Sequence, residues 1–355
     1  MINVTKVFLP PKEEYDKYLE QIWASKYVTN QGTMVNNLQK SLCEYLGVKN
    51  LHYVTNGTVA LELAIEALDI KDGEVITTPF SYVATSSSIL WKNLKPVYVD
   101  IEPDNFTIDV TKIEEKITKD TKAIMPVHVF GYACNIDEIE KIANKHNLKV
   151  IYDAAHAFGS KYKNKSLLNF GDISTCSFHA TKLFNTIEGG ACIVKDDKVS
   201  AKLELAKRFG HNGDTHYCLG INAKQSEFNA AMGLCNLPYV KKIIEKRKQL
   251  SQLYDSLLNG KLTRPKTQKD LEYNCAYYPV LFESEEHLKK VFEVLNFKGI
   301  FPRRYFYPSL NTLDYIKGDS CPISEDISSR IACLPLYFDL ELETVEEISK
   351  IILNV

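Results

Sequence analysis

Short β-branched runs alternate with helix-like stretches between residues 50 and 195, and this alternation restricts the possible folds more than any other feature of the chain. Apolar residues at helical spacing predict helices at 58–68 and 136–144, and a further helix is expected at 84–91 between two strands. Strands are predicted at 51–55, 74–78, 96–100, 122–127, 149–152, 173–178 and 191–194. Strands that alternate with helices are joined by crossovers. We therefore expect an α/β fold, in which a three-layer arrangement places helices on both faces of a mixed, mostly parallel sheet.

The pattern changes after residue 195. Long helices are predicted at 228–258, with a break at Pro238, and a linker follows at 260–267. The remainder has the pattern of a small α+β domain, with a strand at 276–282 and helices at 285–295 and 345–353. We therefore expect a large cofactor-binding domain at residues 1–258 and a small C-terminal α+β domain at 259–355. A length of 355 residues agrees with two domains of ordinary size.

Composition excludes several classes of protein. The chain has 43 Lys and Arg against 45 Asp and Glu, a net charge of −2, and is 45% hydrophobic. Disorder and a polybasic nucleic-acid or membrane surface are therefore not expected. No run is apolar enough to span a bilayer, and the start of the chain lacks a signal-peptide pattern. The nine cysteines form no C-x-x-C pair, so we expect no metal site, reduced thiols and a cytoplasmic protein.

One candidate anion site follows the first strand of the alternating region. The turn Thr55-Asn56-Gly57-Thr58 leads directly into a predicted helix. Gly57 allows the backbone to approach a ligand, and the free N–H groups at a helix start attract anions. The same four residues also suit an ordinary helix cap, so this motif alone leaves both interpretations open.

Two further motifs supply opposite charges at strand ends. Asp153 directly follows an apolar strand and is flanked by small residues, which leave room for a flat ring; a helix cap is the alternative interpretation. Lys182 lies just beyond another buried strand, near Gly189-Gly190 and after Ser177. A lysine that loses solvation there has a lowered pKa and becomes a nucleophile.

An aromatic residue, Tyr82, follows the strand at 74–78 and is placed to stack on a planar ligand, although a packed core aromatic is the alternative. An anion cradle, a nucleophilic lysine, a carboxylate and a ring-stacking aromatic together suit pyridoxal 5′-phosphate. This cofactor needs each of them for its phosphate, its carbonyl carbon, its pyridine nitrogen and its ring face.

The ordered set of motifs resembles the pyridoxal-phosphate-dependent nucleotide-sugar aminotransferases, a branch of the fold type I, aspartate aminotransferase superfamily. The resemblance covers nearly the whole chain. It is carried by the segments 27–32, 56–61, 153–157, 177–182, 188–190, 210–213 and 220–224. It implies an aspartate aminotransferase-like large domain and a cofactor that alternates between the pyridoxal and pyridoxamine forms.

The resemblance also implies catalytic roles. Lys182 would be the Schiff-base lysine, and Asp153 would pair with the pyridine nitrogen. His156 would lie near the phenolic oxygen of the cofactor, and Tyr82 would stack on its ring. Relatives that act as dehydratases carry histidine in place of the lysine, so the presence of Lys182 argues against that branch.

The remaining cofactor contacts follow from the same resemblance. Asn56 belongs to the first cofactor-binding turn, in which Gly57 and Thr58 would hold the phosphate together with Ser177. Asn222 would reach the phosphate of the neighbouring subunit's cofactor, which implies an obligate homodimer with shared active sites. Relatives usually have Ser-Gly-Thr in the first loop and Asn-Tyr-Arg in place of 222–224, so this chain departs from the family at both positions.

The segment at 299–308 gives a hint of the substrate. Its residues Arg303, Arg304 and Tyr307 resemble those of the viosamine-forming enzymes, which aminate C4 of dTDP-4-keto-6-deoxy-D-glucose. An arginine at the mouth of the site suits a diphosphate or the carboxylates of an amino donor, L-glutamate. A pair of surface arginines is the alternative interpretation. The end use of the product, in an antigen polysaccharide, a glycoprotein or an antibiotic, is left open.

Other functions remain as alternatives. The same chemistry at C3 of a dTDP-3-keto-6-deoxyhexose or at C4 of a UDP-ketosugar fits the same motifs. A non-catalytic, cofactor-binding regulatory paralogue is disfavoured because Lys182 and Asp153 are both present. A nucleotide-binding dehydrogenase requires a G-x-G-x-x-G turn after a strand, and none follows the strand at 51–55.

Overall fold

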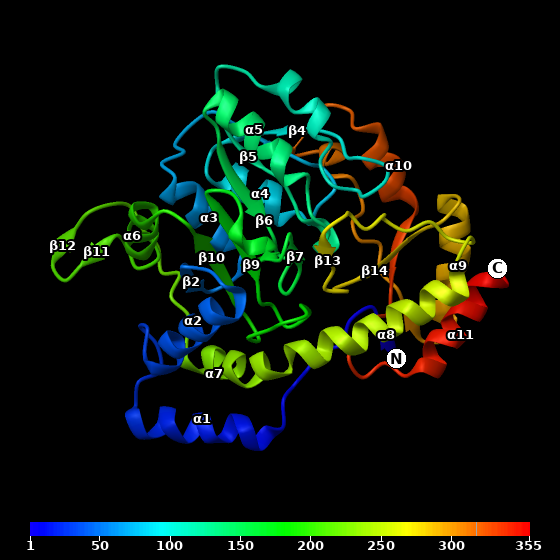
Figure 1. The fold of residues 1–355 in the computed structure, drawn as a ribbon, viewed down its shortest axis with the longest axis horizontal. Helices are drawn as coiled ribbons and strands as arrows, with labels where there is room; N and C mark the ends of the chain where they lie inside the picture. Colours follow the sequence, from blue (N-terminus) through cyan, green and yellow to red (C-terminus); the bar gives the residue numbers. More distant parts are fainter. Residues whose placement is uncertain (317) are drawn as a thin grey trace.

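The computed structural model describes residues 1–316 and 318–355, and its centre is a seven-stranded sheet with the order β2-β10-β9-β6-β5-β3-β4 (Figure 1). These strands are β2 (Asn50–Val54), β3 (Glu74–Thr77), β4 (Lys95–Tyr98), β5 (Thr121–Met125), β6 (Lys149–Asp153), β9 (Ile173–Ser177) and β10 (Gly190–Val194). β10 is antiparallel to both of its neighbours, and the other pairs are parallel. The predicted α/β class is confirmed, and each predicted strand agrees with the observed one to within two residues.

The inner strands are buried along most of their length because helices cover both faces of the sheet. Successive side chains point to opposite faces. In β5, Ile124 belongs to one hydrophobic core while Ala123 and Met125 belong to the other. In β10, Ile193 belongs to the same core as Ile124, and Cys192 belongs to the same core as Ala123 and Met125. The sheet therefore separates two apolar layers, and polar side chains gather at its ends.

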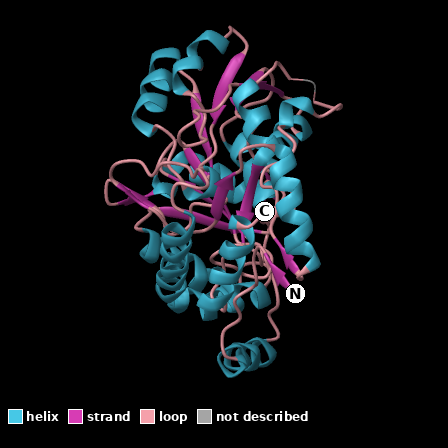
Figure 2. Cartoon of the chain, turned by 90° about the vertical axis from the view of Figure 1, so that its right-hand side faces the viewer, coloured by secondary structure: helices cyan, strands magenta, loops and turns pink. Residues whose placement is uncertain are grey.

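Helices cover both faces, and Figure 2 shows them on either side of the central strands. One face is covered by α3 (Gly57–Ala67), α4 (Ala84–Trp91) and α6 (Asp197–Ala206). The other face is covered by α1 (Lys12–Ser25), α2 (Thr33–Leu46), α5 (Ile136–His146) and α7 (Glu227–Asn236). The predictions of α3, α4 and α5 are confirmed, whereas α1, α2 and α6 were not predicted. In α1 only Ile22 is buried, so its sequence carries little periodic signal.

The N-terminus of α2 is held by a buried carboxylate from far along the chain. The two oxygens of Glu227 accept hydrogen bonds from the backbone N–H groups of Met34 (2.7 Å) and Val35 (3.1 Å). Negative charge at the start of a helix satisfies otherwise unpaired donors and complements the helix dipole. This contact fixes α2 against α7.

The predicted break at Pro238 is confirmed. A 3₁₀ turn at Leu237–Tyr239 separates α7 from α8 (Val240–Leu258). α8 then leaves the large sheet, and its last turns contribute Leu250, Tyr254 and Leu258 to a separate hydrophobic core. This core belongs to the C-terminal part of the chain. The division at residue 258 stays a proposal, because the end of α8 packs with the elements that follow it.

The C-terminal part is a small α+β unit. β14 (Tyr278–Leu281) pairs with β16 (Ile331–Leu334), and β15 (Ile300–Phe301) pairs with the N-terminal strand β1 (Ile2–Asn3). Three helices pack around them: α9 (Glu285–Phe297), α10 (Pro322–Arg330) and α11 (Leu342–Leu353). The predicted strand and two helices of this region are confirmed, and α11 begins three residues before its predicted start. The short strands of the remaining hairpins are β7 (Lys161–Tyr162), β8 (Lys165–Ser166), β11 (His211–Asn212), β12 (Thr215–His216) and β13 (Leu271–Glu272).

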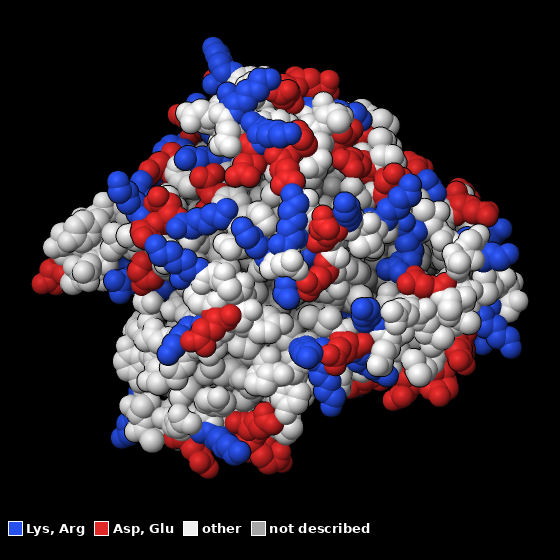
Figure 3. All heavy atoms as spheres, in the orientation of Figure 1, with Lys and Arg blue, Asp and Glu red and all other residues white. Residues whose placement is uncertain are grey.

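Charges of both signs are interspersed over most of the face drawn in Figure 3, and the area over α2 and α7 carries few of them. This face has no continuous basic field of the kind that nucleic-acid binding requires. Within residues 1–316 and 318–355, no helix combines the length and the apolar character needed to cross a membrane.

Candidate active site

A cavity of about 660 Å³ opens at the carboxyl ends of β2, β6 and β9, where ligands bind in open α/β sheets. Most of the predicted site residues converge here, although they come from distant parts of the sequence. The lining includes Asn56, Gly57, Thr58, Tyr82, Asp153, His156, Ser177, Lys182 and Arg303. The parallel strands account for this convergence, because they all end at the same edge of the sheet.

Lys182 and Asp153 are the two charged groups at the centre of the cavity. Asp153 is the last residue of β6, and Lys182 lies in the loop between β9 and β10. Burial lowers the pKa of the Lys182 amine, and the charge of Asp153 acts in the opposite direction. Burial also raises the pKa of the Asp153 carboxyl. A lysine with a lowered pKa exchanges its proton more readily, as a nucleophile and general base must.

Two hydroxyl groups hold Asp153, and sequence reasoning missed both. Thr85 Oγ1 donates to Asp153 Oδ2 at 2.7 Å, and Ser81 Oγ lies 2.7 Å from Thr85 Oγ1. The backbone N–H of Ala155 donates to the other carboxylate oxygen at 3.2 Å. The hydrogen bonds from Thr85 and Ala155 oppose the effect of burial on the pKa of Asp153, so they favour its charged form. A Thr four residues after a Ser at the start of a helix is the sequence signal.

His156 has a fixed tautomer. Its Nδ1 accepts a hydrogen bond from the backbone N–H of Phe130 at 3.1 Å, so the ring hydrogen is on Nε2. Burial lowers the pKa of the imidazole well below its usual value, and the ring therefore stays neutral. Phe130 and Phe306 lie nearly parallel to the ring, with interplanar angles of 8° and 4°. His156 therefore presents a neutral N–H donor on a rigid ring.

The candidate anion cradle lies at the start of α3. Asn56 caps this helix through its side-chain oxygen, which accepts from the N–H of Val59 at 2.9 Å. A Cβ on Gly57 would lie 2.9 Å from the Cβ of Ser177, so only glycine leaves this approach open. The N-terminus of α3 and the Ser177 hydroxyl thus face one space. The capping interpretation and the anion-site interpretation of this turn are compatible.

The predicted ring-stacking residue, Tyr82, lines the cavity with 59% of its surface exposed. Its ring centroid is 6.5 Å from that of Phe306. Tyr82 is therefore not a packed core aromatic, and its ring is available to a ligand.

Of the three predicted substrate residues, Arg303 lines the cavity, whereas Arg304 and Tyr307 are not part of its described lining. Arg303 lines the cavity, and its Cζ is 5.4 Å from the ring centroid of Tyr305. Arg304 instead donates to Glu285 at 2.8 Å and to the carbonyl of Ser329 at 2.6 Å. It also lies 3.4 Å from the ring centroid of Tyr307. Among the described residues that line the cavity, neither Arg304 nor Tyr307 is present.

Asn222 is exposed and lies outside the lining of its own chain's cavity, as far as the described residues define it. Lys224 Nζ donates to its side-chain oxygen at 2.7 Å. Asn222 also pairs with Arg208 through an isolated bridge beside the β11–β12 hairpin. Asn222 is therefore an exposed residue that does not contribute to the described lining of its own cavity.

Two tyrosines of the C-terminal unit complete the cavity wall, and the sequence analysis did not identify them. Tyr277 Oη lies 3.5 Å from Lys182 Nζ. Tyr305 also lines the cavity, and its ring packs edge-on against that of Tyr277, at 5.8 Å between centroids. The C-terminal unit therefore contributes two aromatic side chains to the cavity that contains Lys182.

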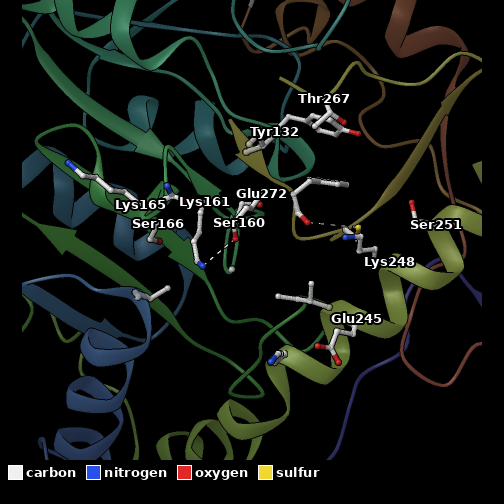
Figure 4. A pocket seen from close by; sticks show the side chains of 18 of the residues that line it. Tyr132, Ser160, Lys161, Lys165, Ser166, Glu245, Lys248, Ser251, Thr267 and Glu272 are labelled. Carbon is white, nitrogen blue, oxygen red and sulfur yellow. Dashed lines mark hydrogen bonds and ion pairs between the residues drawn. The ribbon is translucent and has the colours of Figure 1, made fainter. Parts of the chain in front are cut away.

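A larger groove, of about 1010 Å³, lies between α8 and the β7–β8 hairpin (Figure 4). Charges of both signs line it, and several neutralise one another: Lys161 pairs with Glu272 at 3.2 Å, and Arg264 pairs with Asp255. None of the predicted site residues lines this groove in the part of the chain that the structure describes. We therefore assign the chemistry to the smaller cavity.

Comparisons with known proteins agree with this geometry. The DegT/DnrJ/EryC1/StrS aminotransferase family matches residues 11–353. The chain belongs to this family. The aminotransferase is 43% identical over 98% of its length to a dTDP-4-amino-4,6-dideoxy-D-glucose transaminase of Shigella dysenteriae, covering 97% of that protein. It is 41% identical to an enzyme of the same name from Escherichia coli, with 99% and 98% of the two chains covered.

The fold of the aminotransferase also matches a solved structure. It superposes with a TM-score of 0.94 on DesI, solved in the presence of its TDP-sugar product. The two sequences are 27% identical, and the match covers 99% of this chain and 91% of DesI. The recognition of the family from the sequence motifs is confirmed.

The cofactor of the aminotransferase is pyridoxal 5′-phosphate, and the cavity fits it. Gly57 leaves an open cradle at the start of α3 beside the Ser177 hydroxyl, where a phosphate is favoured. Asp153 is a buried carboxylate suited to a protonated ring nitrogen. Lys182 supplies a buried amine for the carbonyl carbon. Each part of the cofactor thus has a partner of matching chemistry.

Proposed function

We propose that the enzyme transfers the amino group of L-glutamate to C4 of dTDP-4-keto-6-deoxy-D-glucose and forms dTDP-4-amino-4,6-dideoxy-D-glucose. The proposal is supported by the two relatives with 43% and 41% identity, both of which are named dTDP-4-amino-4,6-dideoxy-D-glucose transaminase. Both relatives match over nearly their full length, so the substrate-binding part of the chain is included in the likeness.

We assign the chemical steps to the residues that meet in the cavity. When bound, the cofactor supplies a carbonyl carbon that takes up the amino group and a ring that delocalises negative charge. Lys182 Nζ would move the proton between the Cα of glutamate and the cofactor, and in the second half-reaction between the cofactor and C4 of the sugar. Asp153 keeps the pyridine nitrogen protonated, and the N–H of His156 donates to the phenolic oxygen.

The remaining contacts are assigned by position. Gly57, Thr58 and Ser177 hold the phosphate, Asn56 caps the helix that points at it, and Tyr82 stacks on the ring. Arg303 is the cavity cation for an anionic group, which is either a substrate carboxylate or the sugar diphosphate. We keep Arg304 and Tyr307 as residues that support this loop, because the contacts of Arg304 with Glu285 and Tyr307 hold the chain next to Arg303.

We further propose a homodimer in which Asn222 reaches the partner's cofactor phosphate. Asn222 is exposed and is not among the described residues that line its own cavity, and several apolar side chains are exposed as well. These are Ile187, Phe209, Tyr217, Leu219 and Ile221. A second copy of the chain would cover them. We propose the cytoplasm as the location, since all nine cysteines are free thiols and seven of them are buried.

A product analysis tests the proposed substrate. The enzyme is supplied with glutamate and, in separate reactions, with the 4-keto sugar, its 3-keto isomer, and UDP- and GDP-linked 4-ketosugars. We expect the fastest turnover with dTDP-4-keto-6-deoxy-D-glucose and a product with nitrogen on C4, located by NMR. Faster turnover of any other ketosugar would reject the proposed substrate, and no turnover of any of them would favour a regulatory paralogue.

A further inference from the structure

The hydroxyl of Tyr277 is the only described side-chain group within hydrogen-bond distance of Lys182 Nζ, at 3.5 Å. Tyr277 immediately precedes β14 in the small α+β unit, whereas Lys182 follows β9 of the large sheet. The contact therefore joins the two parts of the molecule at the proposed reacting atom. Asp153 acts on the lysine through its charge, and no hydrogen bond between their side chains is present in the described residues.

The backbone around Tyr277 is anchored on both sides. Arg247 Nη1 donates to the carbonyl of Ala276 at 2.8 Å, and Tyr273 Oη donates to the carbonyl of Tyr277 itself at 2.8 Å. Arg247 is a buried cation of α8 with 3% of its surface exposed. Hydrogen bonds from a charged donor are stronger than neutral ones, so this bond restrains the backbone at Ala276.

A third anchor ties this segment to the loop that carries His156. The side chain of Asn274 donates to the carbonyls of His156 (2.8 Å) and Phe158 (2.9 Å), and it accepts from the N–H of Ala276 at 2.9 Å. Asn274 is itself buried. Tyr277 is thus fixed relative to the same loop that presents His156 to the cofactor.

The ring of Tyr277 is packed as tightly as its backbone. It meets the ring of His156 at 4.8 Å and 61°, and that of Phe130 at 5.9 Å and 60°, between centroids. Burial raises the pKa of the phenol, so its oxygen keeps its hydrogen throughout the working range. Its lone pairs can accept an N–H of Lys182, and this bond fixes the rotation of the amine about its last carbon–nitrogen bond.

We propose that Tyr277 is a positioning residue that orients the amino group of Lys182 during the proton transfers of transamination. The inference rests on the proposed role of Lys182. An amine that donates one hydrogen to Tyr277 has its lone pair directed to one side. This orientation is required in both half-reactions, when Lys182 takes a proton from a substrate carbon and when it returns that proton. No bond to Tyr277 is broken or formed other than this hydrogen bond.

The test compares Tyr277→Phe with Tyr278→Phe in the complete enzyme with bound cofactor. Tyr277→Phe removes only the hydroxyl and keeps the ring. Tyr278→Phe removes a neighbouring buried hydroxyl, which donates to Asp255 at 3.0 Å and belongs to the C-terminal core. We expect Tyr277→Phe to lower kcat about tenfold with KM for glutamate unchanged, the loss expected for one hydrogen bond. Tyr278→Phe should leave both constants unchanged.

Two further readouts separate positioning from a structural effect. With glutamate deuterated at Cα, the isotope effect on kcat should increase in Tyr277→Phe, because proton transfer becomes slower than the other steps. In the resting enzyme without substrate, the pH midpoint of the visible colour of the bound cofactor should move in Tyr277→Phe and not in Tyr278→Phe. Unchanged kcat, isotope effect and colour midpoint would overturn the proposal.

A mapping experiment keeps this inference distinct from the function on which it rests. Borohydride reduction of the wild-type enzyme followed by peptide mass spectrometry should place the cofactor on Lys182. Label on another lysine would reject the proposed role of Lys182. Label on Lys182 with a normal Tyr277→Phe enzyme would reject the role of Tyr277 alone. If Tyr277→Phe fails to fold, Tyr273→Phe replaces it in the test, because this change removes the hydrogen bond that holds the backbone carbonyl of Tyr277. A lower kcat at constant KM would support the proposal, and an unchanged kcat would overturn it.

Discussion

The hydroxyl of Thr85 donates to Asp153 at 2.7 Å, from the second residue of α4 to the last residue of β6. Because its one hydrogen is used in this bond, Thr85 accepts from Ser81 in turn, also at 2.7 Å. All three side chains are buried. The carboxylate that we propose for the pyridine nitrogen is therefore held by two hydroxyl groups in series, neither of which belongs to the family motifs of the sequence.

Thr85→Val should shift the pH dependence of the enzyme. Thr85 lowers the pKa of Asp153, so its removal raises that pKa further above the ordinary value. Asp153 must be ionised to pair with the ring nitrogen. The acidic limb of the kcat profile should therefore move to higher pH, and activity should be lost first at low pH. Unfolding free energy should fall by about 2 kcal/mol, the usual effect of losing a hydrogen bond to a charged group. Thr85→Ser keeps the donor and should restore the wild-type profile; equal profiles for all three proteins would contradict this role.

Lys182→Ala should abolish transamination. The change removes both the amine that joins the cofactor and the group that moves the proton, and general acid–base catalysis alone contributes about 10²–10⁴-fold. The oligomeric state and the circular dichroism spectrum of the wild type should remain, because within residues 1–316 and 318–355 the Lys182 amine has no ion-pair partner and its one hydrogen bond is the long contact with Tyr277. Turnover is followed by formation of the aminosugar nucleotide in mass spectra. Normal turnover in this variant would disprove the proposed mechanism.

Asp153→Asn should weaken cofactor retention and slow proton transfer. An amide keeps the size of the side chain but cannot hold the pyridine nitrogen in its protonated form, so the ring accepts electrons less well. Dialysis of the yellow enzyme followed by absorbance measures retention, and single-turnover kinetics with deuterated glutamate measure proton transfer. Rates near those of the wild type would contradict the role given to Asp153.

Asn222→Ala should loosen the cofactor across the interface between two copies. The expected loss is about tenfold in cofactor affinity, the value of one hydrogen bond to a charged phosphate. Asn259→Ala, an exposed asparagine at the start of the linker, serves as the matched control. Sedimentation should show a dimer for both variants. A wild-type protein that is monomeric and binds the cofactor fully would refute the shared site.

Arg303→Gln and Arg304→Gln should separate binding from support of the loop. Arg303 lines the cavity, so its loss should raise KM for glutamate or for the ketosugar about tenfold. Arg304 is occupied by Glu285 and by the carbonyl of Ser329, so its loss should lower the unfolding free energy by about 1 kcal/mol with little change in KM. A higher KM in Arg304→Gln together with an unchanged KM in Arg303→Gln would contradict this assignment and would show that Arg304 is the residue that binds substrate.

Much of the fold is visible in the sequence because the central strands are short runs rich in β-branched and apolar residues that alternate with helix-like stretches. Thr58–Leu68 is correctly predicted as a helix because the apolar residues Val59, Leu63 and Ala67 recur at helical spacing, and Ala84–Trp91 is correctly predicted as the helix between two strands. α1 was not predicted from the sequence, because Ile22 is its only buried residue and one buried residue gives no periodic pattern. Its position depends on contacts with α7, which lies about 200 residues later and is not visible in a local pattern.

The candidate site divides in a similar way. Lys182, Asp153 and Gly57 are found because they stand at strand ends within short motifs. Tyr277 and Thr85 are missed because their importance comes from what they touch: Tyr277 meets a lysine 95 positions away, and Thr85 meets an aspartate 68 positions away. Arg304 illustrates the converse, because its neighbour Arg303 has the same chemistry and only the backbone direction decides which of them enters the cavity.

The most direct test of the central claim is a single-turnover reaction. The enzyme is converted with glutamate to its pyridoxamine form, freed of excess donor and mixed with dTDP-4-keto-6-deoxy-D-glucose, while the return of the yellow pyridoxal form is followed by absorbance. We predict rapid return of the colour together with one equivalent of dTDP-4-amino-4,6-dideoxy-D-glucose in the mass spectrum. No return of the colour, in an enzyme that still accepts amino groups from glutamate, would contradict the assignment of this sugar as the substrate.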